Sequence, residues 1–332
     1  MLGPYVGLSM LEGSTYLRDS TNMTSDPFSD ILKLANAQSV VSGGFTAGGS
    51  WAIRFPAFDK LKFSALIRGS CWLLIDRVEQ PVRVETGDVM FLSAQRSFVL
   101  ASDLAAVPIE AASVFSPHVS EVVSLGGGEE CLQIGGFVHL DPSSGGLLAD
   151  VLPPLIHVRA ASPHATVLRW LLDQLVHEHA AELPGASLAS AQLAQLIFIQ
   201  ILRAHLEASG NLAAGWLGAL ADRRIAPALQ LMHSDPARSW QLQELAKASA
   251  MSRTTFVVHF KTAAGVPPLT YLLNWRMRLA ERALRADNVP VSALALSLGY
   301  TSESAFSNAF KRTVGMAPKR YRDAARLNSS PL

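Results

Sequence analysis

Towards its carboxyl end the chain repeats one pattern of about twenty residues at a fixed spacing. Residues 252–271 read SRTTFVVHFKTAAGVPPLTY, and residues 302–321 read SESAFSNAFKRTVGMAPKRY. The shared Ser, Phe, Lys, Gly, Pro and Tyr are each fifty residues apart. Two copies of a pattern predict one structural unit used twice, which constrains the fold more than any single element does.

Each copy carries the start and stop signals of a helix. Ser252 and Ser302 are N-cap residues, whose side chains accept otherwise unpaired backbone N–H groups. Gly265 and Gly315 supply the left-handed conformation that ends a helix. The two Phe of each copy are four residues apart, so both rings fall on one face and anchor the helix to a core.

A shorter apolar helix is expected before each copy, at residues 241–249 and 291–298. Residues 250–251 and 299–301 fill tight turns between the paired helices. This arrangement predicts two helix-turn-helix motifs, in which the second helix is presented to the DNA major groove.

A third helix, over residues 268–286, is expected to separate the two motifs, because its apolar residues recur with helical period. Roughly 18 residues at ~1.5 Å each give a rod of ~27 Å. With the width of the flanking motifs, this places two recognition helices about one turn of B-DNA (~34 Å) apart. One chain can then read two successive major grooves.

These residues carry a family resemblance. Its motifs are WQLQELA at 240–246, WRMRLA at 275–280 and GYTSESAFSNAFKRTVGMAPKRYR at 299–322. Together they closely resemble the DNA-binding domain of AraC/XylS-type transcriptional regulators, placed here at residues 219–326. The resemblance implies sequence-specific binding to double-stranded bacterial promoter DNA, most often as an activator that contacts RNA polymerase.

Ten side chains on the faces opposite the Phe pairs are the candidate DNA contacts: Arg253, Thr254, Val257, Val258, Lys261, Glu303, Ser304, Ser307, Asn308 and Lys311. Asn308 suits an adenine edge and Glu303 a cytosine amino group, whereas lysines mostly contact phosphates. The family usually has a base-contacting Arg at the position of Val258. Val257 and Val258 either pack on thymine methyl groups or face the core, or else the first half-site is read weakly.

The charge is divided unevenly along the chain. Residues 219–332 hold 16 Lys and Arg against 7 Asp and Glu, a net +9, whereas residues 1–218 are net −8. A basic half beside an acidic half is typical of a nucleic-acid binder with a separate domain that does not bind DNA. Taken alone, the split also fits an ordinary solvated surface.

The amino-terminal half predicts a β-rich domain. Residues 1–25 are expected to be a disordered tail without the apolar stretch of a signal peptide. Asp26 and Pro27 open a short helix, and short strands follow at 51–55, 62–68, 71–75, 82–85, 89–92, 98–101 and 131–140. Such a series favours a barrel or jelly roll. Residues 63–69 with 85–92 resemble the cupin sensor domain of the same regulator family, assigned to residues 26–160.

The barrel is expected to hold a small-molecule effector of unknown identity rather than a metal or other cofactor. Metal-binding cupins place His where this chain has Ser64 and Ser97, and imidazole is the group that such a site supplies. Candidate effector contacts are Ser64, Trp72, Ser97 and His139, each of which is equally well explained by ordinary packing.

Cys71 and Cys131 are the only cysteines, and both fall in expected strands. They form no zinc pattern or disulfide framework, which fits a reducing cytoplasm. Small buried hydrophobic residues of this kind need no further role. The alternative is a redox-sensing thiol, which requires an exposed or acidified sulfur.

Residues 161–210 are expected to be helical, with a second helix at 188–206 that is apolar over most of its circumference. A helix of that kind is covered on more than one side. It therefore predicts either a homodimer or burial within one subunit. The most apolar run, residues 193–202, is interrupted by Gln195 and Gln200 and is far shorter than the ~20 residues of a membrane span. Residues 210–216 are expected to link this segment to the basic domain.

The predicted fold class is α+β: a cupin-like β-barrel with a helical linker or dimerisation segment, then an all-α domain with tandem helix-turn-helix motifs. The predicted function is a cytoplasmic, nucleoid-associated transcription regulator without enzymatic activity. Two alternatives stay open: a cupin-type metal enzyme tethered to DNA, and a regulator that acts without an effector.

Overall fold

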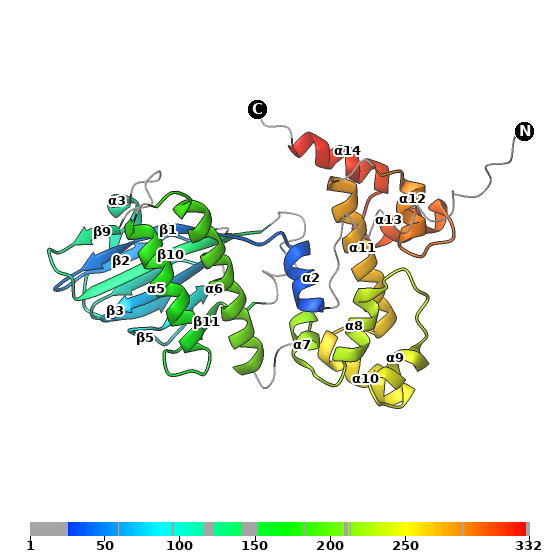
Figure 1. Cartoon of the computed structure of the whole chain (residues 1–332), viewed down its shortest axis with the longest axis horizontal. Coiled ribbons are helices and arrows are strands. Elements are labelled where there is room, and N and C mark those ends of the chain that lie inside the picture. Colours follow the sequence, from blue (N-terminus) through cyan, green and yellow to red (C-terminus); the bar gives the residue numbers. More distant parts are fainter. Residues whose placement is uncertain are drawn as a thin grey trace, which may run out of the picture. The chain divides into compact units, whose positions relative to one another are not determined.

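The computed structural model describes residues 26–58, 60–93, 96–115, 122–140, 152–181, 183–208, 212, 214–286 and 289–329. The tail expected at residues 1–25 lies outside them. Packing divides the chain into two units. Residues 35–210 form the barrel unit, whereas the segment up to Leu34 and the segment from residue 211 onwards together form the helical unit (Figure 1).

The barrel unit consists of two β-sheets. The first has the strand order β11-β6-β3-β10-β1-β9 and the second the order β5-β4-β7-β2-β8. Neighbouring strands are antiparallel except that β1 pairs with β9, and β2 with β8, in parallel. The strands are β1 Gln38–Ala47, β2 Ala52–Phe55, β3 Leu61–Arg68, β4 Ser70–Ile75, β5 Val82–Glu85, β6 Val89–Leu92, β7 Phe98–Ala101, β8 Ile109–Glu110, β9 Val122–Leu125, β10 Cys131–His139 and β11 Leu155–Val158.

The core of this unit lies between the two sheets. Alternate residues of each strand enter it, so Cys71, Leu73 and Ile75 of β4 pack with Phe55, Phe98 and other apolar residues of both sheets. The short helix α3 (Ala111–Val114) contributes Ala111 to the same core. This two-sheet arrangement is the barrel or jelly roll that the strand pattern predicted.

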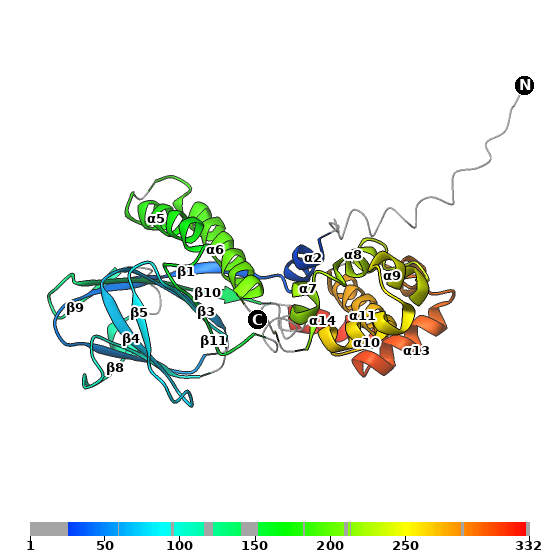
Figure 2. The same ribbon diagram turned by 90° about the horizontal axis from the view of Figure 1, so that it is seen from below.

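Two long helices cover the outer face of the first sheet (Figure 2). They are α5 (Ala165–Ala181) and α6 (Ala186–Ala208). Phe198 of α6 packs on Phe91 of β6 with ring centroids 5.4 Å apart, and Gln195 accepts hydrogen bonds from the backbone and hydroxyl of Ser39. Among the described helices, α6 alone has the length and apolar composition of a membrane span, and 28% of that apolar stretch is buried.

The helical unit contains α2 and eight helices from the carboxyl-terminal part of the chain. They are α2 Pro27–Leu34, α7 Trp216–Ala221, α8 Ala226–Ser234, α9 Leu242–Ala248, α10 Arg253–Ala264, α11 Pro268–Ala286, α12 Val291–Ser297, α13 Glu303–Val314 and α14 Pro318–Ser329. Asp26 caps α2 as expected, because its carboxylate accepts hydrogen bonds from the backbone N–H groups of Phe28 and Ser29.

The α+β fold class is confirmed, and three strands have the bounds expected for them. The structure adds elements that the sequence did not indicate, chiefly β1, β9, β11 and α8. Helix α7 also begins at Trp216, so part of the segment expected as a linker is helical.

Candidate nucleic-acid interface

Helix α10 is held in place by the residues that recur in the repeat. The hydroxyl of Ser252 accepts the backbone N–H of Thr255, and Gly265 ends the helix with φ 75°. Phe256 and Phe260 are fully buried with ring centroids 5.6 Å apart, and Phe260 meets Tyr271 of α11 edge-on at 5.6 Å. The buried face fixes the opposite face towards solvent.

Helix α13 repeats this geometry fifty residues later. Ser302 caps Ala305, and Gly315 ends the helix with φ 89°. Phe306 and Phe310 are buried 5.7 Å apart, and Phe310 meets the ring of Tyr321 edge-on at 5.5 Å. The sequence repeat is therefore a structural repeat, as expected.

Most of the ten predicted DNA contacts are exposed on these two helices. Arg253, Thr254, Val258 and Lys261 are exposed on α10. Glu303, Ser304, Asn308 and Lys311 are exposed on α13, and Ser307 is half-buried. The four exposed side chains of each helix lie away from its Phe pair, which leaves both faces open to a ligand.

The two valines of α10 differ in environment. Val257 is half-buried and packs against the core of the first motif, whereas the side chain of Val258 is 62% exposed. Val258 therefore remains the one valine available for an apolar contact with a base. Packing explains Val257.

The structure adds basic residues that the helix-face argument missed. Arg312 is exposed in the last turn of α13, and Lys319 and Arg320 are exposed in the first turn of α14. The paired basic residues in KR at 311–312 and at 319–320 were the available signal. Lys and Arg near the end of a recognition helix commonly contact phosphates.

A joint between the two motifs holds them in register within the helical unit. Arg276 of the spacer helix α11 donates hydrogen bonds to the carbonyl oxygens of Pro236, Ala237 and Arg238, and its guanidinium lies 5.9 Å from the ring of Tyr300. A Cβ on Gly299 would lie 2.8 Å from the carbonyl carbon of Ala237 and overlap its oxygen. The turn of the second motif therefore abuts the loop before α9.

Close packing, rather than backbone conformation alone, explains the glycine at this joint. Gly299 has φ 81°, but Ala250 holds a similar left-handed conformation, φ 50°, in the turn of the first motif. A side chain is therefore tolerated in that conformation. At Gly299 the neighbouring carbonyl leaves no room for one.

Helix α2 packs on α8 and α11 through a buried polar network. The His233 side chain is fully buried, with Nδ1 3.3 Å from the Asp30 carboxylate and Nε2 2.9 Å from the Tyr271 hydroxyl. Because a carboxylate only accepts, Nδ1–H donates to Asp30 and Nε2 accepts from Tyr271. Burial lowers the pKa of His233 despite the opposing effect of Asp30, and the ring stacks on Trp275 at 4.1 Å.

The four effector candidates do not lie together. Ser64 is buried in the barrel interior, where its hydroxyl accepts from the side-chain amide of Gln133. Trp72 lies on the opposite face of β4 from the core residues and stacks with Arg83. Ser97 is half-buried before β7, and His139 is exposed at the end of β10. Of the four, Ser64 is the one placed in the core.

Both cysteines are buried in the barrel core. Burial raises the pKa of Cys71 to about 12 and that of Cys131 to about 11. Since the thiolate is the reactive form, these surroundings favour the structural interpretation over a thiol sensor.

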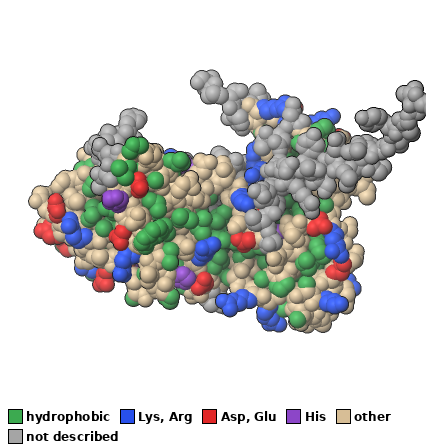
Figure 3. All heavy atoms as spheres, in the orientation of Figure 1, with side chains coloured by type: hydrophobic (Ala, Val, Ile, Leu, Met, Phe, Trp, Pro, Cys, Tyr) green, Lys and Arg blue, Asp and Glu red, His purple; other side chains and the backbone are tan. Residues whose placement is uncertain are grey.

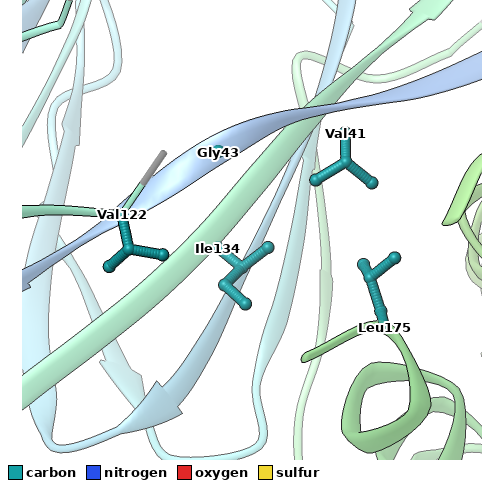
Figure 4. Close-up of a pocket in the computed structure, with 5 residues that line it drawn as sticks. All are labelled: Val41, Gly43, Val122, Ile134 and Leu175. Atoms are coloured by element: carbon teal, nitrogen blue, oxygen red, sulfur yellow. The ribbon is translucent and has the colours of Figure 1, made fainter. Parts of the chain in front are cut away.

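No group of three or more His, Cys, Asp or Glu side chains able to hold a metal ion occurs in the described part of the chain. A small pocket lies between the first sheet and α5, lined by Val41, Gly43, Val122, Ile134 and Leu175 (Figure 4). These lining residues offer no polar side chain to orient a ligand.

Comparison with known proteins agrees with this division of the chain. Residues 26–207 match a cupin family and residues 245–324 match a helix-turn-helix domain family. An AraC-like transcription regulator of Streptomyces antibioticus is 41% identical over 297 residues, 90% of this chain and 98% of the relative. The transcriptional regulator AlkR of Acinetobacter baylyi is 30% identical over 82% of this chain and 91% of its own length.

Among solved structures, the DNA-binding domain of the global transcriptional factor AdpA, in complex with a target DNA, covers 32% of this chain. The match spans 97% of that domain with 28% identity and a TM-score of 0.31. A cupin domain followed by two helix-turn-helix motifs defines a DNA-binding transcription regulator. The chain belongs to the AraC-like family of these regulators.

Proposed function

We propose that this regulator reads two successive major grooves of promoter DNA with α10 and α13, and that an effector bound in the barrel unit controls its activity. The observation that carries the first part is the repeated geometry of the two helices. Each buries a Phe pair and leaves its opposite face exposed, with Arg253 and Val258 on one helix and Glu303 and Asn308 on the other.

The spacer helix supports simultaneous binding of both motifs. Helix α11 has 19 residues, which corresponds to about 28 Å at ~1.5 Å per residue. Together with the widths of the flanking motifs, this is comparable with the ~34 Å between successive major grooves on one side of the duplex. The joint at Arg276 and Gly299 stabilises the spacing within the helical unit.

Selection of binding sites from random DNA with the full chain, followed by footprinting, tests this proposal. Two protected zones about one helical turn apart are expected. Asn308→Ala should lose about 1–3 kcal/mol of binding free energy at one base position of one zone. Lys311→Ala should weaken binding to all sites alike and reduce the slope of log affinity against log salt concentration by about 1. Arg77→Gln, at an exposed turn of the barrel unit, is the charge-matched control. A single short protected zone would overturn the proposal.

Val258 gives a separate test of the first half-site. If its exposed side chain packs on a thymine methyl group, Val258→Ala should weaken the preference for thymine at one position. Unchanged preference at every base of that half-site would exclude the methyl contact. The half-buried Val257 is not expected to have this effect.

We propose further that the regulator is a homodimer through α5 and α6. Hydrophobic side chains gather over these helices on the face shown in Figure 3. Trp170 is 59% exposed and Leu188 is 68% exposed, and Val167 and Leu196 are exposed apolar residues of the same two helices. Exposed apolar patches commonly mark interaction sites.

Sedimentation equilibrium at micromolar concentration tests the dimer. Trp170→Glu should yield a monomer, whereas Leu104→Glu, at an exposed apolar position after β7, should leave the dimer intact. A wild-type monomer at that concentration would exclude this assembly.

We propose, from the family resemblance, that the regulator activates transcription in the cytoplasm by contacting RNA polymerase and has no enzymatic activity. Transcription in vitro from a selected site, with purified polymerase, should rise when the protein is added. Reduced transcription would instead make it a repressor.

A further inference from the structure

One charged side chain in the barrel core has no ionic partner among the residues that the structure describes. Lys62 of β3 is 8% exposed, and its side chain enters the space between the two sheets. Its Nζ lies 4.0 Å from the ring centroid of Phe55, 5.2 Å from that of Phe98, 5.6 Å from that of Phe58 and 5.2 Å from that of Phe137. These four rings form an aromatic cage around the ammonium group.

Within the described residues, Lys62 is the exception among buried charged groups. Asp88 is paired with His157, Asp30 with His233, and Glu281 with Arg278. The described residues offer Lys62 no carboxylate within ion-pair distance and no hydrogen-bond acceptor. Ring faces attract a cation, but they do not replace the acceptors that its three N–H groups require.

The burial of this group carries a free-energy penalty in the absence of an anion. Desolvation lowers the pKa of Lys62 from 10.5 to about 8, so the ammonium form still predominates at neutral pH. A buried ion is stabilised when an opposite charge with good hydrogen-bond geometry is brought to it. Lys62 is therefore a largely buried cation that has no anionic partner among the described residues.

A second cation lies at the outer side of the cage. Lys60 is exposed, and its Nζ lies 5.8 Å from the centroid of the same Phe137 ring that Lys62 approaches. Phe58 and Phe137 are half-buried, so they form the outer wall of the cage. Two like charges that converge on one ring favour the approach of an anion.

The apolar surroundings restrict the rest of the ligand. Beyond the cage the core is formed by apolar side chains, and the polar groups nearest along the strand, Ser64 and Gln133, bond to each other. A ligand of Lys62 would therefore need a single anionic group and an apolar body.

We propose that Lys62 is the anchor of the effector site, and that it binds the carboxylate of a small apolar organic acid whose body packs on Phe58 and Phe137. Lys60 attracts the acid at the rim of the cage. This proposal rests on the proposed effector control, and it names the chemical class of the effector.

Binding of matched acids and amides to the full chain tests the proposal. The probes are benzoate, phenylacetate and hexanoate, each with its neutral amide, measured by calorimetry and by the shift in the thermal midpoint. Acids should bind and amides should not. Lys62→Met should weaken acid binding by about 10-fold to 100-fold, the usual range for a charge-assisted hydrogen bond. Lys60→Met should weaken it only a few-fold, and Lys247→Met, an exposed site in the helical unit, should leave it unchanged.

A second measurement follows Lys62 itself. With lysine labelled at Cε, the resonance that is missing from Lys62→Met should titrate near pH 8 in the free protein and at higher pH with bound acid. Equal binding of acids and amides, undiminished binding by Lys62→Met, or a titration unaffected by all three acids would overturn the proposal.

DNA binding to selected sites separates this proposal from the wider function. Lys62→Met should bind DNA like the wild-type chain. Failure of the wild-type chain to select any DNA would refute the proposed function and leave acid binding as an independent result.

Discussion

Replacing Gly299 by Ala tests whether the joint between the two motifs sets the spacing of the recognition helices. The added Cβ would overlap the carbonyl oxygen of Ala237 and lie 2.8 Å from its carbonyl carbon. Left-handed backbone strain in a residue other than glycine contributes about 1–2 kcal/mol, and overpacking a close contact contributes about 1–3 kcal/mol. The overlap is relieved if the turn of the second motif moves away from the loop before α9. The overpacking penalty then appears as a changed position of α13 relative to α10.

The matched control is Gly315→Ala. Gly315 has φ 89°, and a Cβ there would meet no atom within 4 Å. This variant therefore carries the backbone strain without the overlap. The difference between the two variants isolates the contact with Ala237.

Binding is measured by fluorescence anisotropy on DNA that carries both half-sites at the selected spacing, and on DNA with either half-site alone. Gly299→Ala should lose about 2 kcal/mol, roughly 30-fold, on the double site. Each single half-site should be bound within about 2-fold of the wild-type affinity, since the recognition faces are unchanged. The reasoning is refuted if both variants lose affinity equally, or if single half-sites are weakened as much as the double site.

Three further predictions concern stability. The pKa of Lys62 is lower in the folded state (about 8) than the usual value of 10.5, so the unfolded state holds more protons between these values. The free energy of unfolding of the barrel unit should therefore rise by about 3 kcal/mol from pH 8 to pH 10.5 in denaturant titrations, and this rise should be absent in Lys62→Met. Burial lowers the pKa of His233 below its usual 6.5, so the helical unit should lose stability as pH falls through about 6.5, and less so in His233→Gln. In chemical denaturation, Phe310→Ala should destabilise the second motif by about 3–5 kcal/mol. Leu296→Ala, at an exposed position on α12, should change the stability by no more than about 0.5 kcal/mol.

The repeated motif was the most predictable part of the fold, because each of its signals has a local cause. The caps at Ser252 and Ser302, the glycine stops and the Phe pairs four residues apart all act within a few residues. The spacer at Pro268–Ala286 was predicted with its observed bounds for the same reason.

Strand β1 was missed because its stabilisation is not local. The segment contains Ser42, Gly43 and Gly44, which are typical of turns. In the structure it pairs with β10 across a register shift after Val41, and a Cβ on Gly44 would overlap the carbonyl oxygen of Gln133. Those glycines permit close approach of two strands, which becomes visible only when the partner strand is known.

The candidate contacts show the limit of residue-type arguments. Val257 and Val258 are identical in chemistry, and only packing against the core distinguishes them. Trp72 was a plausible ligand contact by type, but the alternation of β4 directs it away from the core. Lys62 was overlooked because a lysine at the start of an expected strand is usually solvated.

The barrel unit is an insertion within the helical unit, since the chain leaves the latter after Leu34 and returns at residue 211. The DNA-reading half is therefore discontinuous in sequence. A truncated gene product that begins at residue 211 would lack Asp30 and would expose His233 to water. Deletions or proteolytic cuts that remove the barrel unit together with α2 should consequently yield a damaged DNA binder, and not an unregulated one.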